Sequence, residues 1–111
     1  MVILMDIKTS LGILEDNLGF DSELLMFINS AASSLVQLGV AEMNTLIEAD
    51  TEWPVFPNDQ VKALVKHFVS LKVRQTFDPI ASETIANTFL SSVRELEGRI
   101  AYEMAEVLDA G

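Results

Sequence analysis

Residues 79–108 read PIASETIANTFLSSVRELEGRIAYEMAEVL. Apolar side chains recur in this stretch in steps of three or four residues, which is the period of one face of an α-helix. This apolar stripe consists of Ile85, Phe89, Val93, Leu96, Ile100, Met104 and Val107. Asp78 suits the N-terminal cap and Pro79 suits the first helical position, so the spacing predicts one long C-terminal helix.

A straight helix over these residues would be longer than the rest of the molecule. At ~1.5 Å per residue the stretch would span ~45 Å. A compact chain of 111 residues is roughly 35 Å across. The far end of the apolar stripe would then need cover from another chain. The alternative is a kink at Gly98, because glycine in the middle of a helix costs ~1 kcal/mol.

A second helix is predicted over residues 22–38, where apolar side chains again repeat at helical spacing. Asp21 suits its N-cap, because the carboxylate can accept hydrogen bonds from backbone N–H groups in the first turn. Phe20 and Leu25 are placed to form a hydrophobic staple. Gly39 suits the C-terminal cap.

Two more helices complete the expected fold. Residues 6–11 predict a short helix that Gly12 ends, and the stretch that follows, to Gly19, is expected to be a loop. A central helix is expected between Asn58, which suits the cap, and Asp78. No strand pattern or internal repeat is present. The sequence therefore predicts an all-α fold: one domain over residues 1–111, a small bundle of four to five helices.

Residues 40–57 are expected to form a flexible loop. Pro54 and Pro57 favour extended geometry in the residues before them, so a continuous helix is excluded there. Trp53 and Phe56 lie inside this loop. One interpretation is a lid packed onto the core, because large rings usually bury. The other is an anchor for a partner subunit, because tryptophan is enriched at interface hot spots.

Charge is distributed unevenly along the acidic chain, whose net charge is −10. Residues 1–61 carry −9, residues 62–99 carry +2 and residues 100–111 carry −3. An acidic globule repels a phosphate backbone, so sequence-independent nucleic-acid binding is disfavoured. The basic middle segment can meet an acidic surface of the next copy, which favours head-to-tail association and, when closed, a ring. The alternative is an ordinary solvated acidic surface.

The residue types needed for most catalytic chemistry are missing or isolated. The chain has no cysteine and one histidine, His67, which is expected to be a partly buried structural residue. No glycine-rich phosphate loop, nucleophile elbow or calcium loop is present, so no enzyme, cofactor or metal site is predicted. The longest apolar runs are far shorter than the ~20 residues that span a bilayer, and no basic stretch precedes the first. We expect a soluble cytoplasmic protein without a membrane partner.

Four runs of the sequence stand in a recognisable order. Residues 25–40 read LMFINSAASSLVQLGV, Trp53 is followed by Phe56, residues 71–79 read LKVRQTFDP, and residues 95–100 read ELEGRI. In order and spacing, from about residue 7 to residue 101, they resemble a family of tailed-phage head–tail connector proteins, also described as neck, adaptor or DNA-packaging proteins. Ile80 stands where the family often has a second proline, and Gly98 where it often has tryptophan.

The resemblance implies a structural virion protein that forms a homo-oligomeric ring beneath the portal protein, at the head–tail junction. Such a ring extends the DNA channel and presents a platform for a stopper or tail-completion protein. DNA passes through without sequence-specific binding, and an acidic lumen would keep it from sticking. The subunits would be assembled in the host cytoplasm. Expected subunit contacts involve Trp53, Phe56, Lys62, Lys66, Lys72, Arg74, Arg94 and Arg99.

The sequence leaves two other functions open. A small helical-bundle regulator that dimerises through the last helix predicts a two-fold assembly. A DNA-binding packaging factor predicts salt-dependent affinity for duplex DNA, which the net charge of −10 opposes.

Overall fold

The computed structural model describes residues 2–77 and 83–110, with side chains described over residues 2–77 and 87–109. The elements are α1 (Ile3–Leu11), α2 (Asp21–Gln37), a 3-10 turn η1 (Ala41–Met43), α3 (Asp59–Phe77) and α4 (Glu83–Ala110). Over the described ranges there is no β-strand, and the one isolated β-bridge joins Val2 to Glu52. The predicted all-α fold with a long C-terminal helix is confirmed.

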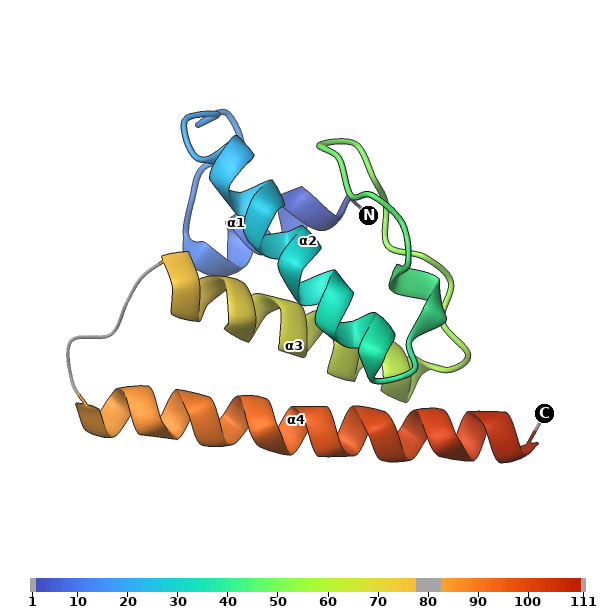
Figure 1. The fold of residues 1–111 in the computed structure, drawn as a ribbon. Helices are drawn as coiled ribbons and strands as arrows, with labels where there is room; N and C mark the ends of the chain where they lie inside the picture. The colour runs from blue at the N-terminus through green and yellow to red at the C-terminus, as the bar shows by residue number, and fades with distance from the viewer. Residues whose placement is uncertain (1, 78–82, 111) are drawn as a thin grey trace.

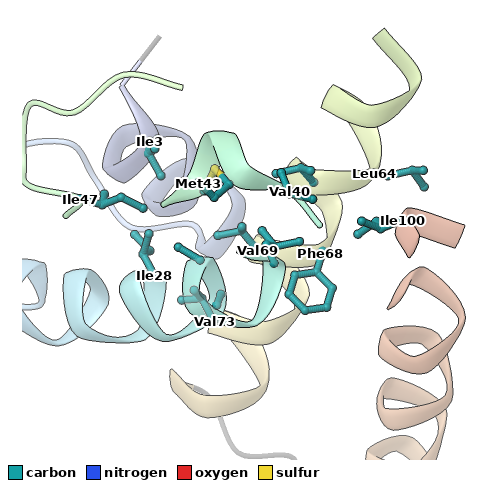
Figure 2. Packing of buried hydrophobic residues seen from close by; sticks show 14 of the residues in the cluster. Ile3, Ile28, Val40, Met43, Ile47, Leu64, Phe68, Val69, Val73 and Ile100 are labelled. Carbon is teal, nitrogen blue, oxygen red and sulfur yellow. The ribbon is translucent and has the colours of Figure 1, made fainter. Parts of the chain in front are cut away.

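Helix α3 is the central element of the fold. It lies between α4 on one side and α1 and α2 on the other (Figure 1). Figure 2 shows Ile100 of α4 close to Leu64 and Phe68, on the side of α3 away from Ile28 of α2. Buried side chains on both sides of α3 therefore join the two layers into one hydrophobic cluster. These residues of α3 are Val61, Leu64, Val65, Phe68, Val69 and Val73.

Glycine and asparagine end or begin the helices largely as the sequence predicts. Gly12 ends α1 with a φ of +74°, and Gly39 follows α2 with a φ of +102°, values that L side chains rarely adopt. The N–H of Val61 donates to Oδ1 of Asn58 at 2.8 Å, which confirms the predicted cap of α3. α1 begins at Ile3, three residues earlier than predicted, because the first turn is also buried in the core.

The predicted N-cap of α2 is wrong. Asp21 is the first helical residue, the preceding Phe20 occupies the cap position, and no side chain caps the helix. The Asp21 carboxylate instead lies 2.9 Å from Nζ of Lys8, so an ion pair with α1 takes the place of the local cap. The ring of Phe20 packs edge-on against Phe77 at the end of α3, with ring centroids 5.2 Å apart. Contacts with α1 and α3 thus hold the start of α2, where the sequence predicted a cap within α2 itself.

Helix α4 is one unbroken helix of 28 residues. At ~1.5 Å per residue it is about 42 Å long, close to the longest dimension of the molecule, 43 Å. Figure 1 shows α4 as a straight helix, and Gly98 lies within its unbroken range, so the alternative of a kink is wrong. Asp78 and Pro79, the predicted start, lie outside the described residues.

The inner face of α4 packs against α3, the one described helix that it contacts. Its buried side chains are Val93, Leu96, Ile100 and Met104. The opposite face is open: Tyr102 is 64% exposed and Leu108 is 74% exposed. None of the helices in the described part of the chain has the length and apolar character needed to cross a membrane.

Candidate subunit interface

The segment between η1 and α3 is held against the helices by hydrogen bonds. Asn29 of α2 donates to the carbonyl of Ile47 at 2.9 Å and accepts from the N–H of Ile47 at 2.9 Å. The N–H of Ile3 donates to the carbonyl of Thr51 at 3.0 Å. The sequence analysis gave Asn29 no role, because its partner lies 18 positions away. These contacts fix where the following aromatic residues lie, while the predicted flexibility of residues 40–57 stays a prediction.

Trp53 connects this segment to two helices. Its Nε1–H donates to Oδ2 of Asp6 in α1 at 2.6 Å. Nζ of Lys66 in α3 lies 3.4 Å from the same oxygen and 5.4 Å from the centroid of the Trp53 ring. The ammonium is thus placed for both a charge pair and a cation–π contact. Phe56 is buried, with 9% of its surface exposed. Both rings pack onto the body of the protein, as the lid interpretation predicted.

A groove of about 560 Å³ opens beside Trp53. Its walls are residues 53–59 and the side chains of Lys62 and Lys66, one helical turn apart on α3. Lys62 is exposed, and Asp59 is the acid that lines the groove. Val55 stands at the wall with 91% of its surface exposed. We call this surface the Trp53 groove. A mainly polar lining with two ammonium groups and a few apolar side chains suits a segment that carries both carboxylates and apolar side chains.

The other predicted contact residues do not join this groove. Lys72 is half-buried and Arg74 is exposed, and two positions on an α-helix differ by ~200°, so they point to opposite sides of α3. Arg94 and Arg99 are exposed on α4, beside a shallow hollow of about 340 Å³ at Gly98. The structure therefore brings together Trp53, Phe56, Lys62 and Lys66, and their part in subunit contacts stays a prediction.

His67 is exposed on α3, so its predicted partial burial is wrong. The reason is its place between Lys66 and Phe68: the ring of Phe68 turns into the core and leaves the preceding position outside. Within residues 2–77 and 87–109, no three acidic or histidine side chains lie close enough to hold a metal ion.

The loop between α1 and α2 depends on a buried lysine that the sequence analysis did not single out. Lys8 is 1% exposed. Its ammonium donates to the carbonyls of Glu15 at 3.0 Å and Asn17 at 2.8 Å, and pairs with Asp21. The sequence signal that could have indicated this burial is the place of Lys8 directly after Ile7 in a helix that begins with apolar residues. We call residues 12–20 the leucine loop, because Leu14 and Leu18 project from it with 73% and 69% of their surfaces exposed.

The fold and these surfaces define a class: a small all-α protein whose long last helix packs by one face on a core of three helices. The sequence model of the family described as phage connector protein matches residues 3–107, so the chain belongs to that family. The resemblance to head–tail connector proteins is thereby confirmed. Membership indicates a structural virion component that works with other phage proteins. Searches of the curated proteins and of the solved structures found no match.

Proposed function

We propose that this protein forms a ring at the portal vertex, which joins the DNA-filled head to the tail or stopper and extends the DNA channel. The family match over residues 3–107 carries the proposal. In this role the whole chain acts as one connector domain, located at the head–tail junction of the virion and assembled in the host cytoplasm. Its partners are further copies of itself, the portal protein and a stopper or tail-completion protein.

The open outer face of α4 supports this proposal. A helix of 28 residues offers a long rigid surface, and one described helix covers its inner face. The outer face carries charged side chains, Arg94 and Arg99 among them, together with the exposed ring of Tyr102. Such a mixed surface is typical of contacts between subunits that also exist apart.

The net charge of −10 supports the channel role. A ring of acidic subunits repels the DNA backbone, so DNA passes without being held. A sequence-specific DNA contact is not part of the proposal, and neither is a chemical step.

A dimer formed through the apolar stripe of the last helix has less support. The stripe residues Val93, Leu96 and Ile100 are already buried against α3, with at most 4% of their surfaces exposed. A dimer through this face would have to expose the core of each subunit.

The experiment that tests the proposal measures native mass by light scattering over a concentration series, with and without the portal protein of the same phage, and images large species by negative-stain electron microscopy. A closed ring with a central hole is expected, at least on the portal. A dimer or tetramer with two-fold symmetry in both conditions would contradict the proposal.

A further inference from the structure

We propose that the leucine loop of one subunit docks in the Trp53 groove of the next subunit, so that one copy of this chain is the ligand of another. This inference rests on the proposed ring. It assigns the two surfaces that meet and the direction in which the subunits follow one another.

The leucine loop is held as a projecting feature. The buried ammonium of Lys8 fixes the carbonyls of Glu15 and Asn17, and the N–H of Ile13 donates to the carbonyl of Lys8 at 2.9 Å. A buried lysine is costly to desolvate unless it is fully bonded, as it is here. Its bonds keep two leucines in solvent, whereas an unheld loop of nine residues would be free to fold them away.

The chemistry of the loop complements that of the groove. Leu14 and Leu18 flank Glu15 and Asp16, both of which are exposed carboxylates. The groove combines apolar side chains of the proline-bounded segment 53–57 with polar lining that includes the ammonium groups of Lys62 and Lys66, the latter also paired with Asp6 at 3.4 Å. Apolar and acidic groups on one side thus face apolar and basic groups on the other.

The two surfaces lie at opposite ends of α3. The leucine loop leads to Phe20, whose ring contacts Phe77 at the C-terminal end of α3, whereas Lys62 lies at its N-terminal end (Figure 1). Fifteen positions separate Lys62 from Phe77, roughly 22 Å along the helix axis. One subunit therefore cannot fill its own groove, but it can donate its loop to one neighbour and accept the loop of another. A heterologous contact of this kind generates a ring when it closes.

Disulfide trapping tests the pairing directly, because the chain contains no cysteine. The variants are Leu14→Cys/Val55→Cys and Leu18→Cys/Val55→Cys, each oxidised with and without the portal protein. A disulfide requires Cα atoms about 4.4–6.8 Å apart. The leucine loop and the groove lie toward opposite ends of α3, so we expect no bond within one chain. We expect at least one of the two to give a ladder of covalent oligomers that reductant collapses. Met26→Cys/Val55→Cys is the control, since Met26 on α2 is 62% exposed outside both surfaces.

Assembly of exposed-residue variants gives the second measurement. Leu14→Ser/Leu18→Ser should raise the concentration for half-assembly at least about tenfold, while Met26→Ser should leave it unchanged. Mixed with a groove variant, Lys62→Glu, the loop variant should form a pair that cannot extend, because one functional loop and one functional groove remain between them.

The outcomes distinguish a failure of the docking inference from a failure of the proposed ring function. Rings that form from Leu14→Ser/Leu18→Ser as from the unchanged chain, with no ladder above the control, would overturn the docking inference and leave the proposed function standing. An unchanged chain that forms no ring with or without portal would overturn the proposed function and this inference with it.

Discussion

Replacing the buried lysine tests how the leucine loop is held. Lys8→Met keeps the length of the side chain and its packing among apolar neighbours but removes the ammonium. Two carbonyls, those of Glu15 and Asn17, lose a charged donor at 3.0 and 2.8 Å, and the carboxylate of Asp21 loses its partner at 2.9 Å. The free energy of unfolding should fall.

The expected loss is about 3 kcal/mol. Hydrogen bonds from a charged donor contribute ~1.5–3 kcal/mol each, and breaking a buried ion pair by removing one partner costs ~3–5 kcal/mol. These values do not add here, because one ammonium makes all three contacts. The desolvation cost of the ammonium also disappears in the variant. A loss of this size corresponds to a fall in Tm of roughly 12 °C in a chain of this length.

The assay is urea unfolding followed by far-UV circular dichroism at a concentration where the protein is monomeric. Lys62→Met is the matched control, since this lysine is exposed, and it should change stability by less than about 0.5 kcal/mol. Lys8→Met/Asp21→Leu should recover much of the loss, because replacing both partners leaves no unpaired carboxylate. If Lys8→Met loses less than about 1 kcal/mol, the ammonium does not hold the loop and the reasoning fails.

Three further substitutions test other parts of the structure. Trp53→Phe removes the N–H that Asp6 accepts at 2.6 Å, and thermal unfolding should show a loss of about 1–2 kcal/mol; an unchanged Tm would mean that the indole does not tie the segment to α1. Asn29→Ala leaves both backbone groups of Ile47 without their partner, so urea unfolding should show a loss of about 2–3 kcal/mol, and a loss under 0.5 kcal/mol would contradict that role. Gly98→Ala adds a methyl group into open space on an exposed helix face and should raise stability by about 1 kcal/mol; a fall in Tm would show that the position is strained or covered.

The contacts among Asp6, Trp53 and Lys66 make Lys66 an unsuitable position for testing ring assembly by mutation. Charge reversal of Lys66 would place a carboxylate beside that of Asp6, which already pairs with Lys66 at 3.4 Å. A defect in ring formation would then reflect a damaged subunit as readily as a lost contact. Lys62→Glu avoids this ambiguity because its side chain is exposed on the same groove.

The apolar periodicity predicted the fold because it reports burial within one element. The stripe through Val93, Leu96 and Ile100 is buried as expected. Caps were predictable where the cap and its partner are close in sequence, as with Asn58 and the N–H of Val61.

Contacts between distant residues could not be predicted in this way. Asp21 has the residue type and position of an N-cap, yet Lys8 competes for its carboxylate across 13 positions of the chain. Trp53 was identified as an aromatic of interest, but its partner Asp6 is 47 positions away and gives no local signal. The candidate interface depends on such pairs, so one sequence could suggest its residues but not which of them share a surface.

The one-sided packing of α4 also bears on the order in which the structure comes apart. Each of α1 and α2 contacts more than one other helix, and Lys8, Asn29 and Trp53 fasten the segments between them, whereas α4 contacts α3 alone among the described helices. Parts of a structure that depend on a single contact surface can open at a lower free energy than the global unfolding transition. α4 can therefore detach without separating any other pair of described helices, and an assembled neighbour lying along it would slow its amide hydrogen exchange.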